Sequence, residues 1–187
     1  MIIMRKKITV FLFEFASTCV SAIAIIALIF IIGIRVTTVN GSSMEPTLSD
    51  SDKLVIICSE QKFEYKDIVI ICEPNILDEI IVKRVIATEG QWVDVRYNEG
   101  LVYVGDSPDT MKPLDEDYTA CLTDEFNPED RHEYPVQVPE NCIFAMGDNR
   151  NDSTDSRSFR VGFVQEGYIL GKVLFRFAPS FDFSLYD

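Results

Sequence analysis

The sequence predicts a mainly β protein, in which an antiparallel β-sheet or barrel-like core carries a polar inserted lobe and follows one N-terminal transmembrane helix. Three observations predict this fold. Residues 15–34 form an uncharged apolar stretch of twenty residues, and short runs rich in β-branched residues recur after it, separated by turn residues. Between Asp106 and Glu140 the composition then changes to Asp, Glu, Pro and Thr.

The apolar stretch is long enough to cross a bilayer. At about 1.5 Å per residue, a helix of about 20 residues spans a hydrocarbon core of about 30 Å. The alternative is a removed secretory signal, but such a signal has an apolar region of about 7–15 residues and a small-x-small cleavage site. The sequence IRVTTVNGS that follows lacks this site. Because Arg5, Lys6 and Lys7 precede the stretch, we expect a cytoplasmic N-terminus (1–7), an anchor (8–35) and an extracytoplasmic remainder.

The predicted external part is strongly acidic. The whole chain carries a net charge of −13, and residues 1–35 hold four cations against Glu14, so the remainder is more acidic still. Such a domain repels phosphate backbones, and no basic stripe interleaved with aromatic residues is present. The charge pattern therefore disfavours nucleic acid as a partner.

The external cysteines lack metal-site spacing. Cys58, Cys72, Cys121 and Cys142 contain no C-x-x-C pair. In an oxidising compartment the first disulfide to expect joins Cys121 to Cys142. The alternative for Cys58 and Cys72 is a pair of buried free thiols at the ends of two VIIC runs.

The expected strands lie in apolar runs on both sides of the lobe. Those before it are 53–58, 67–73, 79–87, 91–97 and 101–104, and those after it contain the sequences CIFAM and YILGKVLFRFA. The run QWVDVRY alternates as a half-exposed antiparallel strand should, and Asn98-Glu99-Gly100 predicts a hairpin turn after it. We therefore expect a β core at 36–105 and 141–187, interrupted by an acidic lobe at 106–140.

The first polar block that can carry chemistry is Gly41-Ser42-Ser43-Met44-Glu45-Pro46-Thr47-Leu48. Ser43 follows Arg35 by eight positions, so it lies within roughly 26 Å of the predicted membrane boundary. Pro46 stiffens the loop around this serine. Taken alone, the block is more often a simple serine-containing turn.

The second block is the strand at 80–86, in which alternation places Lys83 among aliphatic residues on one face and Arg84 on the other. Burial disfavours the charged form of a lysine, so the pKa of such an amine falls toward the range in which it can act as a base. Arg84 cannot do this, because a guanidinium stays protonated. By itself, a lysine that reaches solvent or pairs with a carboxylate is the simpler interpretation.

The third block is the loop from Gly147 to Arg157, which follows the apolar run CIFAM. Its carboxylates and arginines can form a fixed ion-pair network, with Asp148 or Asp155 meeting Arg157 in bidentate geometry. Ser153 is then a candidate to orient the lysine amine. The chain has one histidine, His132 in the acidic lobe, where a solvated side chain is a better interpretation than a member of a catalytic triad.

In this order and after an N-terminal anchor, the three blocks resemble the bacterial type I signal peptidases, which are serine-lysine leader peptidases. The matching motifs are S-M-x-P-T-L at 43–48, K-R-V at 83–85 and G-D-N-R-x-x-S-x-D-S-R at 147–157. The resemblance implies that Ser43 is the nucleophile and Lys83 the general base. It also implies that Ser153 supports the lysine and that Asp155 and Arg157 form a structural ion pair.

The sequence departs from the family at Gly41, where some members carry a serine whose hydroxyl helps to form the oxyanion hole. We therefore expect the N–H of Ser43 to do more of this work, together with the N–H of Gly41. The family also commonly has Gly-x-Pro-Gly-Asp after K-R-V, where this chain has Ala87-Thr88-Glu89-Gly90-Gln91.

The resemblance implies a membrane-bound endopeptidase that cuts secreted preproteins after small residues at positions −1 and −3 and needs no metal or organic cofactor. The residues expected to form the substrate pocket are Val39, Met44, Leu48 and Val82. Two alternatives stay open. One is a non-cutting membrane adaptor that binds preproteins or pilin-like clients, and the other is a self-cleaving repressor-type peptidase, whose DNA-binding region the apolar helix would replace.

Overall fold

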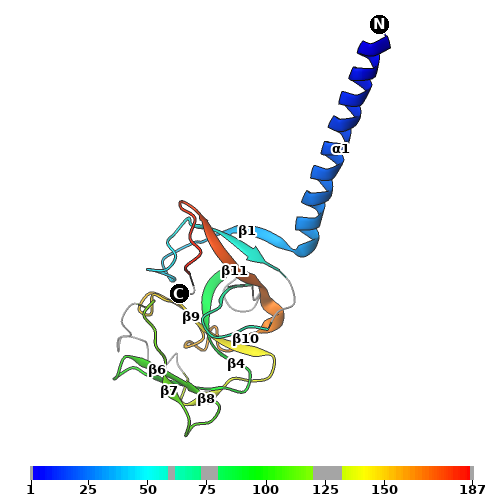
Figure 1. The fold of residues 1–187 in the computed structure, drawn as a ribbon. Helices are drawn as coiled ribbons and strands as arrows, with labels where there is room; N and C mark the ends of the chain where they lie inside the picture. Colours follow the sequence, from blue (N-terminus) through cyan, green and yellow to red (C-terminus); the bar gives the residue numbers. More distant parts are fainter. Residues whose placement is uncertain (1, 59–61, 73–79, 120–131, 186–187) are drawn as a thin grey trace.

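The computed structural model describes residues 2–58, 62–72, 80–119 and 132–185 (Figure 1). It contains one long N-terminal helix and a body built from two antiparallel sheets. The predicted mainly β fold with one apolar helix is therefore confirmed.

Helix α1 (Ile2–Ile32) projects away from the body (Figure 1). It begins before the predicted start at residue 8 and ends at Gly33, whose positive φ of 79° a helix cannot continue. The segment Val10–Leu28 is long and apolar enough to cross a membrane, with a mean hydropathy of 2.1. Its large side chains have no protein partner, and Phe13 is 75% exposed, so this surface requires an apolar environment.

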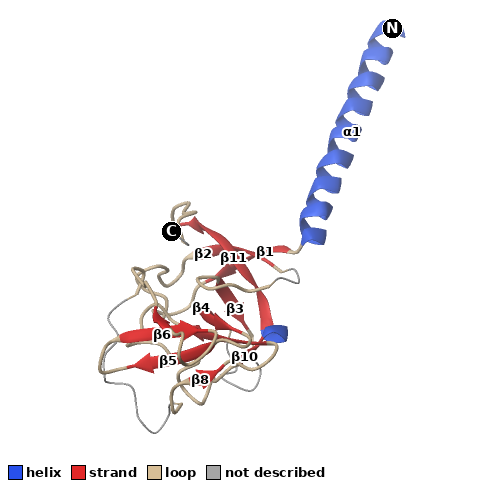
Figure 2. Cartoon of the chain, turned by 60° about the horizontal axis from the view of Figure 1, so that its bottom comes forward, coloured by secondary structure: helices blue, strands red, loops and turns tan. Residues whose placement is uncertain are grey.

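The larger sheet has the order β1-β2-β11-β3-β4-β9-β10. Its strands are β1 (Ile34–Thr38), β2 (Lys53–Ile57), β3 (Ile68–Ile71), β4 (Ile81–Thr88), β9 (Cys142–Met146), β10 (Val164–Gln165) and β11 (Ile169–Ala178), the last preceded by the short 3-10 helix η2 (Glu166–Tyr168). Register shifts occur where β11 pairs with β2 and β3 and where β4 pairs with β9. Such bulges bend and twist strands, which is why the sheet curls (Figure 2).

The smaller sheet has the order β7-β6-β5-β8 and lies on the side of the body away from α1 (Figures 1 and 2). Its strands are β5 (Trp92–Arg96), β6 (Leu101–Gly105), β7 (Lys112–Pro113) and β8 (Val136–Gln137). The predicted β5–β6 hairpin is confirmed, and its buried positions are Val93 and Val95 on β5 and Val102 on β6. The sheet joins strands from both sides of the boundary expected at residue 105.

The core strands β3, β4 and β9 have almost no exposed face. One apolar cluster packs β2 and β3 against the chain that follows β1, and another joins β9 to the smaller sheet. The polar side chains in the middle of β4, Lys83 and Arg84, are therefore enclosed by their neighbours.

Cys58 after β2 and Cys72 after β3 are free thiols at strand ends. The second interpretation of that pair also expected free thiols, but both are half-buried rather than buried. Cys142 is buried on β9, and the expected pairing with Cys121 falls outside the described residues.

Candidate active site

Ser43 lies in a tight turn between β1 and β2. The turn is closed by hydrogen bonds from Glu45 N–H to the Ser42 carbonyl and from Leu48 N–H to the Met44 carbonyl, at 3.0 and 2.9 Å. The side chains of Met44 and Leu48 are 1% and 0% exposed, because both are sunk into the apolar cluster below. The sequence thus alternates anchoring apolar residues with polar ones and fixes the backbone that displays Ser43.

Lys83 approaches this serine from the middle of β4, where it pairs with Val69 of β3. The distance from Lys83 Nζ to Ser43 Oγ is 2.7 Å, a hydrogen-bond distance. Lys83 is only 3% exposed, and burial lowers the pKa of its amine below the ordinary lysine value. Asp155 opposes this shift and Arg157 adds to it. A buried amine with a lowered pKa beside a hydroxyl has the arrangement that proton transfer requires.

The loop after β9 forms the second wall of the site. Asp155 accepts two hydrogen bonds from the Arg157 guanidinium, at 2.8 and 2.9 Å, and both residues are at most 1% exposed. Asp155 also accepts from Gly147 N–H at 3.0 Å and from the Ser153 hydroxyl at 2.7 Å. Burial alone would raise the pKa of the Asp155 carboxyl, but Arg157 and the Gly147 N–H outweigh it, so the pKa falls below its ordinary value and the group is an anion.

Gly147 is the point at which this loop meets the serine turn. A β-carbon at this position would lie 2.3 Å from Ser153 Oγ and 2.4 Å from the carbonyl oxygen of Ser43, so only glycine fits. Asn149 adds two bonds to the same turn, from its N–H to the Ser43 carbonyl at 3.0 Å and from its side-chain amide to the Ser42 carbonyl at 3.2 Å. The two loops are therefore packed without space between them.

Arg84, next to Lys83 on the opposite face of β4, holds a second buried ion pair. Its Nε and Nη2 donate to the two carboxylate oxygens of Asp148 at 2.9 and 2.7 Å, and the two side chains are 1% and 0% exposed. Thr47 donates to the same carboxylate at 2.6 Å. The remaining Arg84 donors reach the carbonyls of Lys66 and Leu185. One guanidinium thus ties the serine turn, β4, the Gly147 loop and the C-terminal segment together.

Three sequence-based expectations change with this geometry. Of the two carboxylates expected to meet Arg157, Asp155 does so, and Asp148 pairs with Arg84 instead. In the same described residues, Ser153 bonds to Asp155 and not to the amine of Lys83. The N–H of Gly41 donates to Asp50 at 2.8 Å, so it does not serve as the expected second oxyanion donor in this conformation.

The N–H of Ser43 has a different environment. Among the described residues no acceptor lies within hydrogen-bond distance of it. It is therefore available to an incoming oxygen atom.

The expected pocket residues belong to one apolar cluster. Val39, Met44 and Leu48 are at most 2% exposed, so they support the serine turn from below and cannot line an open pocket. Val82 retains 9% exposure. The sequence identified apolar neighbours of the site, but hydrophobicity alone does not separate residues that line a pocket from residues of the core beneath it.

His132 does not belong to this site. Its ring packs against Phe159 and Phe163, with centroids 4.8 and 5.3 Å apart, so the expected solvated side chain is wrong. Burial lowers the pKa of His132. The residue contributes to an aromatic cluster under the lobe.

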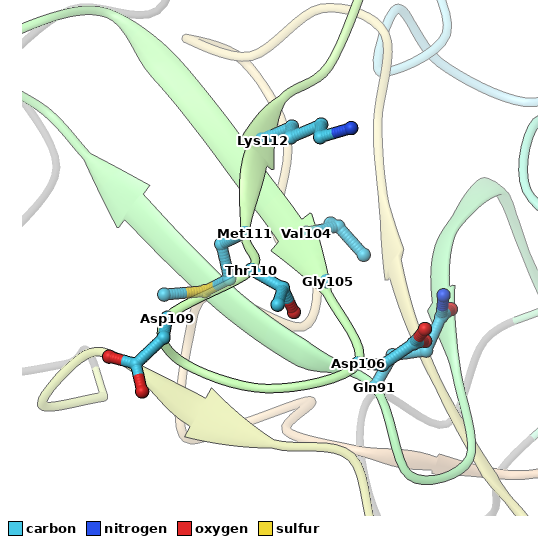
Figure 3. Close-up of a pocket in the computed structure, with 8 residues that line it drawn as sticks. All are labelled: Gln91, Val104, Gly105, Asp106, Asp109, Thr110, Met111 and Lys112. Atoms are coloured by element: carbon cyan, nitrogen blue, oxygen red, sulfur yellow. The ribbon is translucent and has the colours of Figure 1, made fainter.

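An open pocket of about 580 Å³ lies elsewhere, on the smaller sheet (Figure 3). It is lined by Gln91, Val104, Gly105, Asp106, Asp109, Thr110, Met111 and Lys112. Lys112 and Asp106 lie at opposite ends of this pocket (Figure 3). No nucleophile with a neighbouring base lines this pocket in the described chain, whereas Ser43 and Lys83 form such a pair in the buried site.

Comparison with known proteins identifies the chain. The profile of the family described as "Signal peptidase, peptidase S26" matches residues 12–178. The chain belongs to the signal peptidase family. This confirms the resemblance that the three blocks predicted.

Named signal peptidases agree with this assignment. A probable signal peptidase I-1 of Synechocystis sp. is 36% identical over 74% of this chain and 68% of its own length. Signal peptidase I S of Bacillus subtilis is 32% identical over 89% of each chain. A crystal structure of a signal peptidase I from Enterococcus faecalis has a TM-score of 0.44 at 27% identity, covering 61% of this chain and 98% of that one. As a signal peptidase, the chain is a serine protease.

Sequence reasoning missed several polar residues of this signal peptidase. The role of Arg84 had a signal, because a guanidinium stays charged when it is buried and then needs a carboxylate. No sequence signal pointed to the contacts that the lobe makes through Glu116 and Tyr118. Nothing in the sequence of the acidic stretch distinguishes these two residues from its other carboxylates and aromatic residues.

Proposed function

We propose that this signal peptidase is a membrane-anchored endopeptidase that removes signal peptides from secreted preproteins, with Ser43 as nucleophile and Lys83 as general base. The observation that carries the proposal is the distance of 2.7 Å between Ser43 Oγ and the Nζ of a lysine that is 3% exposed. A serine hydroxyl is a weak nucleophile by itself and needs a base within hydrogen-bond reach. Among the described residues, Lys83 is the base in that position.

In the first half of the reaction, the neutral amine of Lys83 takes the hydroxyl proton as Ser43 Oγ attacks the scissile carbonyl. The negative charge then develops on the carbonyl oxygen, and the N–H of Ser43 is the donor that supports it. The protonated Lys83 gives its proton to the leaving amine, which departs as the C–N bond breaks and leaves an acyl-enzyme. Neutral Lys83 then takes a proton from water, which attacks the acyl carbonyl. The bond from this carbon to Ser43 Oγ breaks, and Lys83 returns the proton to Oγ, so that the free acid leaves and the Ser43 hydroxyl is restored.

Ser153, Asp155 and Arg157 act on this reaction through position. The Asp155 carboxylate is fixed by Arg157, and it accepts hydrogen bonds from the Ser153 hydroxyl and the N–H of Gly147. Its negative charge favours the protonated amine that forms when Ser43 loses its proton, and this lowers the free energy of the transition state.

The proposed substrates are preproteins with small residues at positions −1 and −3. An extended peptide that pairs with a strand of the body places alternate side chains on the same face. Positions −1 and −3 therefore point the same way. The family resemblance supports this preference.

The proposed location is a bacterial cell membrane, with α1 as a single span, the N-terminus in the cytoplasm and the body outside. The apolar segment Val10–Leu28 and the basic residues before it support this topology. Helix α1 runs into β1 with only Gly33 between them, so Ser43 stays close to the bilayer surface. Protease treatment of right-side-out and inverted vesicles tests the orientation, because only the right-side-out vesicles should lose the body.

The activity is tested by incubating a model preprotein with detergent-solubilised wild type, Ser43→Ala and Lys83→Ala, with circular dichroism as the folding check. Cleavage after a small-x-small site by wild type alone is the expected result. Binding of the preprotein without cleavage by wild type would contradict the proposal and favour the adaptor. Full activity of folded Lys83→Ala would exclude the serine-lysine pair.

A further inference from the structure

We propose that residues 115–118 of the acidic lobe are a strap that positions the two loops of the active site, through Glu116 and Tyr118. The inference rests on the proposed function, since it concerns the loops that hold Ser43 and Lys83. The strap acts on these two residues through a pair of buried arginines, Arg150 and Arg84.

The first arm of the strap joins Glu116 to Arg150. The Arg150 guanidinium donates to both carboxylate oxygens of Glu116, with 2.9 Å from Nη1 to Oε2, and the side chains are 2% and 10% exposed. Bidentate contact fixes the plane of the guanidinium as well as its position. Arg150 in turn donates from Nε to the Gly147 carbonyl at 3.1 Å and accepts from Arg157 through its own carbonyl at 2.8 Å.

Gly147 passes this constraint on to the reacting groups. A β-carbon added to it would overlap both the Ser43 carbonyl and the Ser153 side chain, so there is no room for a methyl group. Close-packed interiors transmit displacements rather than absorb them. A shift of Arg150 therefore moves Gly147, and with it the serine turn relative to Lys83.

The second arm joins Tyr118 to Arg84. The guanidinium carbon of Arg84 lies 4.1 Å from the centroid of the Tyr118 ring, so the ring packs on the guanidinium whose edge donates to Asp148. The Tyr118 hydroxyl donates to Glu116 at 3.0 Å and lies 3.3 Å from the Tyr65 hydroxyl. Burial raises the pKa of Tyr118, so its hydroxyl keeps the proton that links the two arms.

These contacts predict an effect on turnover rather than on substrate affinity. The strap lies behind the arginines, so its loss changes the distance and angle between Ser43 Oγ and Lys83 Nζ. A misplacement of about 1 Å in a reacting pair costs about 10²-fold in rate. Binding of the extended peptide depends on strand edges that the strap does not form.

The molecule contains a matched control on its surface. Glu99 accepts hydrogen bonds from Arg96 and Tyr103, and the Arg96 guanidinium lies 4.0 Å from the centroid of the Tyr103 ring. The trio has the same residue types as the strap contacts but lies on the surface of the β5–β6 hairpin. Glu99→Gln and Tyr103→Leu therefore make the same chemical changes far from the proposed mechanism.

The experiment compares Glu116→Gln and Tyr118→Leu with these two controls in the full chain, using a preprotein peptide as substrate. Active sites are counted from the burst of leaving group released by an activated ester. We expect kcat per active site to fall about 10- to 100-fold with KM within about twofold. The conservative variant Tyr118→Phe, which keeps the ring over Arg84, should recover most of the rate, and the controls should match wild type.

Two results would overturn the strap. Variants that melt at a lower temperature but keep the wild-type kcat per active site would show that the strap contributes to stability and not to the rate. Variants that raise KM at unchanged kcat would place these residues in substrate binding. Ser43→Ala tests the proposed function separately. Cleavage by that variant would show that Ser43 is not the nucleophile, whatever the strap variants do.

Discussion

Arg84 and Asp148 form a bidentate ion pair that is shielded from solvent. Arg84 directly follows Lys83 in the chain. Because successive residues of a strand point to opposite faces, the neighbours Lys83 and Arg84 contact different loops. Lys83 meets Ser43, whereas Arg84 locks β4 to the Gly147 loop and, through Thr47, to the serine turn. The pair therefore fixes the distance between the two proposed catalytic residues.

Removing one charge of this pair should be costly. Asp148→Asn leaves the Arg84 guanidinium buried without its anion, and breaking a buried pair in this way lowers the free energy of unfolding by about 3–5 kcal/mol. Urea unfolding followed by circular dichroism measures the change. Asp94→Asn, which breaks the partly exposed pair with Arg96, is the control and should cost at most about 1 kcal/mol. Equal losses in both variants would contradict a special role for the buried pair.

Gly147→Ala tests the close contact between the two loops. The added methyl group would overlap the Ser43 carbonyl and the Ser153 side chain, so one of the loops must move. We expect kcat to fall by about 10²-fold or more, since the displacement separates Ser43 from its base. The control is Gly167→Ala in η2, where a β-carbon meets nothing within 4 Å. Wild-type kinetics for folded Gly147→Ala would show that the contact is not needed.

Much of the fold could be predicted because local patterns determine it. The alternation in 91–97 identified β5, and Asn98-Glu99-Gly100 identified its turn, where Gly100 has the expected positive φ of 68°. The short strands β7, β8 and β10 have two residues each and leave no periodic pattern. The order of the strands could not be predicted either, since long-range packing places β11 between β2 and β3.

The site divides in the same way. Motif resemblance selected Ser43 and Lys83, which are 40 residues apart in the chain, and the structure brings them to hydrogen-bond distance. The partner of Asp148 could not be chosen from the sequence, because Arg157 is nine residues away and Arg84 is 64. The resemblance implied that Arg157 pairs with Asp155, as the structure has it, but only the folded sheet shows that Asp148 pairs with Arg84. Burial of a charge predicts that it has a partner, and topology decides which one.

At pH values below the ordinary pKa of lysine, the variant Lys83→Met should be more stable than wild type. Because burial lowers the pKa of Lys83, the unfolded chain binds its proton more tightly than the folded chain does. The resulting penalty is complete below the folded pKa and disappears as the pH rises to the ordinary value near about 10.4. The variant lacks this penalty, which amounts to about 1.4 kcal/mol for every tenfold difference in proton affinity between the folded and unfolded chains.

The measurement is the free energy of unfolding in urea at pH 7 and at pH 10. The stability of Lys83→Met relative to wild type should be greatest at pH 7 and smaller at pH 10. Lys53→Met, which changes an exposed lysine on β2, should follow wild type at both values. A difference between Lys83→Met and wild type that does not vary with pH would contradict the lowered pKa.

The pH dependence of kcat/KM reports the same amine through catalysis. Lys83 accepts the proton of Ser43 only when it is neutral, so the rate should rise tenfold per pH unit below its pKa and level off above it. Burial, opposed by Asp155, sets that pKa below the ordinary lysine value, and the midpoint should therefore fall below about 10.4. Initial rates of preprotein cleavage from pH 6 to pH 11 define the curve, with circular dichroism at each end of the range to separate ionisation from unfolding. A rate that stays constant across this range, in protein that remains folded, would mean that another group takes the proton and that the short distance between Lys83 and Ser43 has only a structural role.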